Sequence, residues 1–237
     1  NVGGTLALLD AMLDEGVRSF VFSSTCATYG IPDRVPITEA EKQRPVNPYG
    51  ESKLFVERAL HWYGEAYGLR WAALRYFNAA GADPDGELGE EHEPETHLIP
   101  LTVRAALGRG PSLEIFGTDY PTPDGTCLRD YIHVCDLADA HIRALEALER
   151  GAPSGAFNVG TGRAHSVKAV IDTVGRVVGR PVAGQSAARR PGDPAVLYAS
   201  SDRAQRELGW QPRYADLEVI VRHAWQWHSS HPRGYAG

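Results

Sequence analysis

Residues 17–30, VRSFVFSSTCATYG, and residues 47–53, NPYGESK, decide the fold class of this chain. The first stretch is an apolar, β-branched and aromatic run of strand length that ends in small polar residues, which predicts a strand and a following loop. In the second stretch, Asn47 and Pro48 are typical of a helix N-cap and a first helical position. Together they predict a strand, a loop and a helix that runs from about residue 48 to about residue 67.

Strand and helix patterns go on alternating in both directions from these two stretches. A helical pattern precedes the first strand and ends at Gly16. The remaining strands are expected at 69–77, 113–116, 131–134 and 157–159. The remaining helices are expected at 98–107, at 136–149 with Asp136 as N-cap, at 167–178 with Ser166 as N-cap, at 201–208 and at 216–230. This alternation predicts an α/β protein with a mostly parallel sheet that helices cover on both faces.

Composition narrows the class of protein. The 237 residues carry a net charge of −6, a balance that argues against a nucleic-acid partner. The chain has neither a membrane-spanning apolar run nor a secretory signal, so we expect no membrane partner. The three cysteines, Cys26, Cys127 and Cys135, form no CxxC pair, and the 9 histidines show no metal-ligand spacing. We therefore expect no metal, no disulfide framework and a reducing compartment, the cytoplasm.

The sequence also predicts a catalytic group made by Thr25, Tyr49 and Lys53. Tyr49 and Lys53 are four residues apart on the expected helix and share a face, and Thr25 ends a strand, where ligands bind in open α/β sheets. A lysine ammonium beside a phenol favours the phenolate, as does a first-turn position, so Tyr49 is a candidate base. A YxxxK pair alone occurs on many surface helices, and the strand-end Ser-Ser-Thr before it favours the catalytic interpretation.

These residues carry a resemblance to a known family. Thr25, Tyr49 and Lys53 resemble the Ser/Thr–Tyr–Lys triad of the extended short-chain dehydrogenase/reductases. More closely, the chain resembles the UDP-glucose 4-epimerase family within the NAD-dependent epimerase/dehydratases. The matching stretches span the chain: NVGGTL, FSSTCATYG, NPYGESK, LRYFNAAGADPDGELGE, IFGTDYPTPDGTCLRDYIHVCDLADAH, FNVGTG, RRPGD and HPRGY.

The resemblance implies an activity and a cofactor. The family interconverts UDP-glucose and UDP-galactose by reversible NAD-dependent oxidation at sugar C4, through a 4-keto sugar. On this chain the resemblance implies that Tyr49 is the base and that Thr25 relays the proton. Lys53 would hold the nicotinamide ribose and lower the pKa of Tyr49. The two helices that flank Tyr49 resemble those through which the family dimerises, which implies a homodimer.

The resemblance also implies binding residues. For NAD they are Ser23, Thr25, Tyr49, Lys53, Tyr76 and Phe77, with Phe77 near the nicotinamide. For the UDP-sugar they are Thr25, Tyr49, Asn78, His97, Leu98, Phe116, Arg129, Tyr131, Arg190, Asp193 and Leu197. Phe116 would stack on uracil and Asp193 would accept from the ribose hydroxyls. Arg129, Tyr131 and Arg190 would bind the diphosphate, because guanidinium groups bind phosphate oxygens in bidentate fashion.

Two of these positions differ from the family pattern. His97 stands where the family often has Asn, so its contact with the nucleotide is less well matched. Leu197 stands where the family has either Tyr or a smaller residue in the hexose pocket. Our hypothesis is that Leu197 leaves more room than Tyr and allows partial acceptance of N-acetylated hexoses.

The segment FNVGTGRAH, residues 157–165, is similar to the start of a GxGxxG dinucleotide-binding loop. His165 stands in place of the third glycine, and the segment comes late in the chain. A true dinucleotide fingerprint belongs to the first βα turn of the fold. We therefore predict a tight turn here.

Alternatives remain at the level of the substrate. Cys26 and Ala27 follow Thr25 where a 4,6-dehydratase has Asp-Glu, and neither can serve as the acid or base that elimination of water needs. A UDP-sugar 4-epimerase for pentoses, uronates or N-acetylhexosamines stays open, because few side chains read the sugar.

The start of the chain leads to a further alternative, an inactive nucleotide-sugar-binding fragment. The chain begins at Asn1 without a Gly-rich phosphate loop, and the resemblance places about 90 residues ahead of it. We expect the 237-residue piece alone neither to retain NAD nor to epimerise. The expected architecture is the C-terminal part of a Rossmann-type doubly wound parallel sheet, formed by 1–78 with 131–150. A smaller mixed α/β domain, formed by 79–130 with 151–237, would bind the UDP-sugar.

Overall fold

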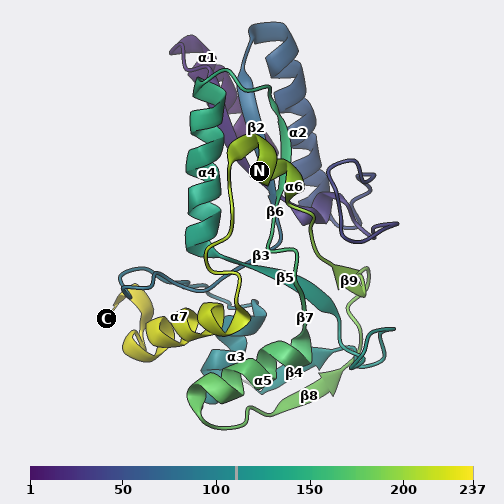
Figure 1. Ribbon diagram of the computed structural model, residues 1–237, viewed down its shortest axis with the longest axis vertical. Coiled ribbons are helices and arrows are strands. Elements are labelled where there is room, and N and C mark those ends of the chain that lie inside the picture. Colours follow the sequence, from purple (N-terminus) through teal and green to yellow (C-terminus); the bar gives the residue numbers. More distant parts are fainter. Residues whose placement is uncertain (110–111, 237) are drawn as a thin grey trace.

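A parallel sheet with helices on both faces forms the first of two regions in this computed structural model, which describes residues 1–109 and 112–236 (Figure 1). Strands β1 (Ser19–Thr25), β2 (Arg70–Tyr76) and β6 (Gly155–Val159) lie in the order β1-β2-β6. Helices α1 (Val2–Asp14) and α2 (Pro48–Tyr67) cover one face, and α4 (Val134–Glu149) and α6 (Asp202–Leu208) cover the other. This confirms the expected α/β class.

The core of this region shows why both faces of the sheet are apolar. Ala73 of β2 packs with Leu60 of α2, while its neighbours Ala72 and Leu74 pack with α4 and α6 on the opposite face. Successive side chains of a strand point to opposite faces, so a strand covered on both sides is apolar at consecutive positions. The uninterrupted apolar run in LRWAALRYF follows from this.

The second region is a mixed layer of short strands on three packed helices. Strand β5 (Leu128–His133) pairs with β3 (Asn78–Ala80) and β9 (Val196–Leu197) in parallel and with β7 (Ala164–Ser166) antiparallel. A separate pair joins β4 (Leu113–Phe116) to β8 (Gly184–Ala187). Helices α3 (Leu98–Ala106), α5 (Val167–Val178) and α7 (Leu217–Ser230) share one apolar cluster, and two short 3-10 turns, η1 (Cys26–Thr28) and η2 (Gly234–Ala236), complete the list.

Local signals in the sequence are confirmed where a cap defines a helix. The Asn47 side chain accepts a hydrogen bond from the Gly50 amide at 2.8 Å, Pro48 follows it, and Gly68 ends α2 at a φ of 69°. Ser166 caps α5 in the same way. These interactions involve neighbours in sequence, which is why the pattern of residues was sufficient to locate them.

The predicted N-cap at Asp136 is wrong. Helix α4 begins at Val134, and Asp136 lies buried in its first turn. Its carboxylate accepts the backbone amides of Arg213 and Tyr214 at 2.9 and 2.8 Å. Asp136 therefore holds a distant segment of the chain against α4.

The order of the strands also places some residues in a different region from the one expected. Strand β6 lies beside β2 in the first sheet, and α6 packs against α4, so residues 155–159 and 202–208 belong to the first region. Strand β5 pairs with β3, so residues 131–133 belong to the second region. The chain crosses between the regions more often than the sequence analysis anticipated.

The FNVGTG segment forms the predicted tight turn. Buried Asp130 accepts hydrogen bonds from the amides of Thr161 and Gly162 at 2.9 and 3.0 Å. A Cβ on Gly160 would lie 2.6 Å from the Asp130 carboxylate, too close for any side chain. The backbone amides of this turn therefore bind the carboxylate of Asp130 and not a nucleotide phosphate.

No helix within residues 1–109 and 112–236 combines the length and apolar character needed to cross a membrane.

A buried ion pair between Glu57 of α2 and Arg75 of β2 joins the elements of the first region. The Arg75 guanidinium contacts the Glu57 carboxylate at 2.6 Å and donates to the Tyr29 hydroxyl at 2.9 Å. Tyr29 in turn donates to Asn158 of β6 at 2.7 Å, and Ser24 of β1 donates to Glu57. Because each charged group has several partners, the network offsets the cost of removing the two charges from water.

Removing the Arg75 charge should destabilise the protein strongly. In Arg75→Met, Glu57 is left buried and without its cation, and we expect a loss of about 3–5 kcal/mol in the free energy of unfolding, measured by denaturant titration. The matched control is Arg222→Met, which removes an exposed pair with Glu218 and should cost less than about 1 kcal/mol. Equal losses in the two variants would contradict the assigned role of the buried pair.

Candidate active site

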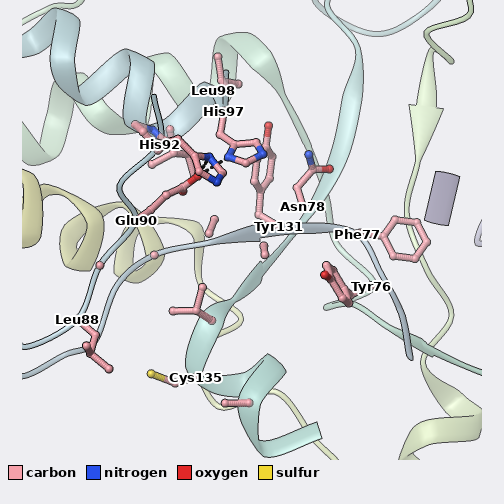
Figure 2. A pocket seen from close by; sticks show the side chains of 18 of the residues that line it. Tyr76, Phe77, Asn78, Leu88, Glu90, His92, His97, Leu98, Tyr131 and Cys135 are labelled. Carbon is pink, nitrogen blue, oxygen red and sulfur yellow. Dashed lines mark hydrogen bonds and ion pairs between the residues drawn. The ribbon is translucent and has the colours of Figure 1, made fainter. Parts of the chain in front are cut away.

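A cavity of about 820 Å³ lies where the carboxyl ends of β1 and β2 meet the second region (Figure 2). Thr25 and Tyr76 reach it from the strand ends, and Tyr49 reaches it from the first turn of α2. The opposite wall is formed by residues 88–90, 92 and 97–100. Ligands of open α/β sheets bind at this end of the strands.

Thr25 and Tyr49, the two hydroxyl residues of the predicted triad, line this cavity together. Thr25 is the last residue of β1, and its Oγ1 accepts the Ala27 amide at 3.1 Å, which fixes the side chain at the start of η1. The Tyr49 side chain is half-exposed. Lys53 lies behind them: its ammonium donates to the Ser23 carbonyl at 2.9 Å and is 5.7 Å from the centre of the Tyr49 ring.

The expected lowering of the Tyr49 pKa by Lys53 is wrong for this structure. Partial burial raises the pKa of Tyr49 above its usual value, and the nearby Thr25 hydroxyl opposes this only in part. Burial also lowers the pKa of Lys53. The ammonium lies over the ring and is bound to a backbone carbonyl, so its charge does little for the phenol oxygen.

The residues predicted to bind a cofactor separate into two groups. Tyr76 and Phe77, at the end of β2, line the cavity. Ser23 does not line the cavity: its hydroxyl lies 2.8 Å from His141 Nε2, and its carbonyl accepts a hydrogen bond from Lys53. The backbone carbonyl of Ser23 in β1 therefore positions the Lys53 ammonium near the site.

Besides Thr25 and Tyr49, four of the residues predicted to bind the substrate line the same cavity: Asn78, His97, Leu98 and Tyr131. Asn78 and Tyr131 are paired in register on β3 and β5. His97 precedes α3, and its Nδ1 is bound to the Glu90 carboxylate, which raises the pKa of His97.

A second group, Phe116, Arg129, Arg190 and Asp193, gathers near β4 and β9 and does not line the 820 Å³ cavity. We call it the arginine cluster. The Arg190 guanidinium carbon lies 3.9 Å from the centre of the Phe116 ring, on the surface expected to hold uracil. Arg129 forms an ion pair with Asp193. In this structure Asp193 neutralises Arg129, and the Arg190 guanidinium lies over the aromatic ring.

Leu197 lies between the two groups. It is paired with Arg129 in register and packs in a buried cluster with Phe77 and Ala199. It does not line the cavity, so its effect on a hexose would pass through Phe77, which does. The hypothesis about N-acetylated hexoses stays a prediction.

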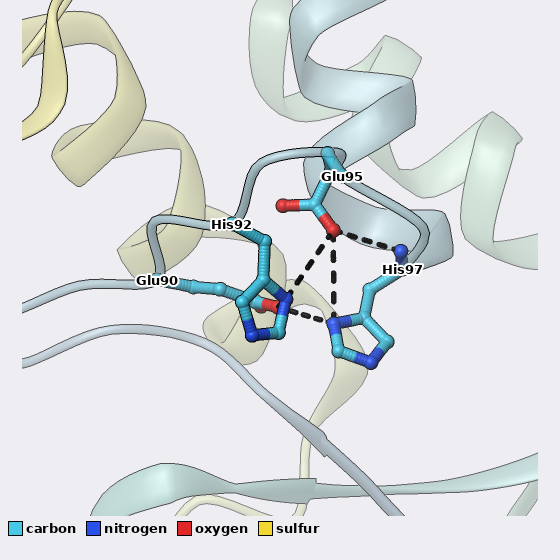
Figure 3. A group of neighbouring side chains, drawn as sticks. All are labelled: Glu90, His92, Glu95 and His97. Atoms are coloured by element: carbon cyan, nitrogen blue, oxygen red, sulfur yellow. Dashed lines mark hydrogen bonds and ion pairs between the residues drawn. The ribbon is translucent and has the colours of Figure 1, made fainter.

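The sequence analysis missed a group of four side chains on the cavity wall: Glu90, His92, Glu95 and His97 (Figure 3). One nitrogen or oxygen from each lies within 4.8 Å of the others. The signal was present in EEHEPETH, residues 90–97, where four Glu and two His fall within eight positions. We call this group the His–Glu cluster.

The alignment with a similar known protein spans the whole length of this chain. The NAD dependent epimerase/dehydratase family matches residues 1–160. The UDP-glucose 4-epimerase of Halalkalibacterium halodurans is 55% identical over 236 residues, which cover 100% of this chain and 71% of that protein.

Solved structures of UDP-glucose 4-epimerases also have the same fold as this chain. The UDP-glucose 4-epimerase of Brucella ovis in complex with NAD has a TM-score of 0.91 and 54% identity, over 94% of this chain and 69% of that one. The UDP-glucose 4-epimerase of Bifidobacterium longum in complex with NAD⁺ and UDP has a TM-score of 0.91 and 37% identity, over 98% of this chain and 69% of that one.

The ionisation of Tyr49 can be measured directly. The near-ultraviolet absorbance of phenolate in the protein, minus that in Tyr49→Phe, should show Tyr49 ionising above its ordinary pKa of 10.0 when no cofactor is bound, because burial disfavours the charged form. Lys53→Met should leave this midpoint little changed. A midpoint well below 10 that rises in Lys53→Met would restore the original expectation for Lys53.

Proposed function

This chain belongs to the NAD dependent epimerase/dehydratase family, and on that premise we propose that it interconverts UDP-glucose and UDP-galactose at sugar C4. The observation that carries the proposal is the meeting of Thr25 and Tyr49 on one cavity at the carboxyl ends of the strands. The similarity to UDP-glucose 4-epimerases extends over all of this cavity's walls. A tyrosine and a threonine so placed can move a proton to and from a sugar hydroxyl.

The residues of the cavity fit NAD as the cofactor. Tyr76 and Phe77 supply an aromatic wall beside Thr25, which suits a flat nicotinamide ring. The Lys53 ammonium has three N–H groups, of which the structure pairs one with the Ser23 carbonyl, and the others suit ribose hydroxyls. When bound, NAD supplies reversible hydride acceptance at sugar C4.

Tyr49 and Thr25 handle the proton in this proposal. Tyr49 accepts the proton of the C4 hydroxyl, and the Thr25 hydroxyl, which can donate and accept, carries it between them. Burial raises the pKa of Tyr49 and so favours the protonated phenol, whereas a positive charge close to the phenol oxygen would favour the phenolate. The sugar would lose the proton of its C4 hydroxyl to Tyr49 and the single hydrogen on C4 as a hydride to bound NAD, which would leave a 4-keto sugar.

The arginine cluster is the proposed site of the uridine diphosphate. Arg190 lies against Phe116, and Arg129 is held by Asp193. A uracil ring stacked on Phe116 would displace Arg190 and direct its guanidinium to the diphosphate, whose oxygens it can bind in bidentate fashion. The Asp193 carboxylate would then be near enough to the ribose to accept from its hydroxyls.

We further propose a homodimer through α1 and α2. Leu8 of α1 and Phe55 and Trp62 of α2 are large apolar side chains that are half-exposed or more. The two helices pack against each other, so these side chains belong to one helical layer on the outside of the sheet. Exposed apolar surface of this kind is typical of a protein–protein contact.

The proposed location is the cytoplasm. Cys26, Cys127 and Cys135 are all free thiols in the structure. Burial raises the pKa of Cys26 to about 12, so its thiol is inert although it lines the cavity beside Thr25. Unpaired cysteines are typical of a reducing compartment.

The proposal is tested by Tyr49→Phe in the protein expressed from its complete reading frame. Loss of the proton acceptor should lower the rate of UDP-galactose conversion by about 10²–10⁴-fold, because general base catalysis contributes that much. The affinity for UDP should not change. The control is Tyr67→Phe, an exposed tyrosine at the end of the same helix, which should keep full activity. A fully active Tyr49→Phe would refute the proposed role.

Arg190→Ala tests the diphosphate site independently of the reaction. Loss of charged hydrogen bonds to phosphate should weaken UDP binding by about 10–100-fold in calorimetric titration. Uridine should lose little affinity, since it has no phosphate. Arg180→Ala, an exposed arginine after α5, is the matched control. If Arg190→Ala binds UDP as tightly as the unchanged protein, the arginine cluster is not the diphosphate site.

A further inference from the structure

The His–Glu cluster has the chemistry of a transition-metal site. Its inward atoms are Nδ1 of His92 and His97 and Oε1 of Glu90 and Glu95. His92 Nδ1 lies 3.2 Å from the Glu90 oxygen and 3.9 Å from the Glu95 oxygen, and His97 Nδ1 lies 3.7 Å from the latter. Four ligands around a tetrahedral Zn²⁺ lie about 3.3 Å apart, so the wider pairs, which lie within 4.8 Å, would contract and the close His97–Glu90 pair would open to complete the shell.

Glu95 is the more deeply buried of the two carboxylates in this cluster. Its side chain is only 1% exposed, yet its Oε2 has no hydrogen-bond partner and the nearest cation, Arg104, is 4.0 Å away. Its Oε1 accepts the backbone amides of Thr96 and His97 at 2.7 and 2.8 Å, which aims that oxygen at the two imidazoles. A buried carboxylate beside a second carboxylate is costly unless a positive charge lies between them.

The loop that carries the cluster is held in place from outside. Gly89 lies against the buried Trp227 ring of α7, where a Cβ would come within 2.2 Å of the indole. The Tyr235 hydroxyl bonds both the amide and the carbonyl of Gly89 at 2.9 Å, and the Trp227 indole donates to the Glu90 carbonyl at 3.3 Å. A loop fixed at its base places ligands before the metal arrives, which lowers the entropic cost of binding.

We propose that Glu90, His92, Glu95 and His97 bind one divalent transition-metal ion, with Zn²⁺ as the reference ligand, on the wall of the substrate cavity. Two imidazoles and two carboxylates suit Zn²⁺ and its first-row neighbours, whereas Mg²⁺ and Ca²⁺ prefer shells of oxygen alone. The ion takes the place of the proton that His97 otherwise shares with Glu90. Glu90, His92 and His97 line the cavity, so the ion lies at its surface (Figure 2).

The experiment titrates the untagged protein with Zn²⁺ in competition with a chromophoric chelator, without nucleotide, so its result does not depend on the proposed reaction. We expect one ion per chain with a Kd of about 1 µM or tighter, and no competition by Mg²⁺. His92→Ala and His97→Ala, which change half-exposed ligands, should each weaken binding by about tenfold or more. The absorption spectrum of bound Co²⁺ should be that of a tetrahedral N₂O₂ site and should disappear in the double variant.

Two matched controls distinguish this site from other histidines. His61→Ala removes an exposed histidine of α2, and His223→Ala removes a partner of the close His133–His223 pair. Both should bind Zn²⁺ as tightly as the unchanged protein, and circular dichroism checks that every variant is folded. Failure to bind Zn²⁺ below about 100 µM overturns the proposal. So does unchanged affinity in folded His92→Ala and His97→Ala, or loss of binding in His223→Ala.

Discussion

The buried ion pair between Glu57 and Arg75 is the constraint on which the active site depends. It connects α2 to β2 directly, to β1 through Ser24, and to β6 through Tyr29. Thr25 is the residue after Ser24, and Tyr49 lies two turns before Glu57 on the same helix. The distance between the hydroxyls of Thr25 and Tyr49, which we propose to be catalytic, is therefore set by a hydrogen-bond network in the core that neither of them joins. A surface helix without such an anchor could rotate or slide relative to the strand.

The sequence predicted the elements that neighbouring residues determine. The cap at Asn47, the glycine at Gly68 and the apolar runs of the strands were enough to place α2 and β2. The sequence was also sufficient to single out Thr25, Tyr49 and Lys53, because the end of a strand and the first turns of a helix have recognisable patterns. These are local interactions, and their signals lie within a few positions of one another.

Local sequence patterns did not predict the features that depend on contacts between residues far apart in the chain. Asp136 resembled an N-cap but binds the backbone near Arg213, and β6 pairs with β2, which ends about eighty residues earlier in the chain. The pKa of Tyr49 depends on how deeply the ring is buried and on where the Lys53 ammonium settles, neither of which a spacing of four residues reveals. The His–Glu cluster was overlooked because residues 90–97 form an irregular loop, and no helix or strand period predicts how the side chains of such a loop come together.

The close contact between Gly89 and Trp227 has a consequence for the evolution of this fold. The indole is buried between His231 and Tyr235 and has no room to turn aside, so the two positions share one space. A relative that carries any side chain at position 89 must have a smaller residue at position 227, or must move the loop that forms the cavity wall. Residues 138 positions apart are thus bound to change as a pair, and the shape of the substrate cavity is inherited with them.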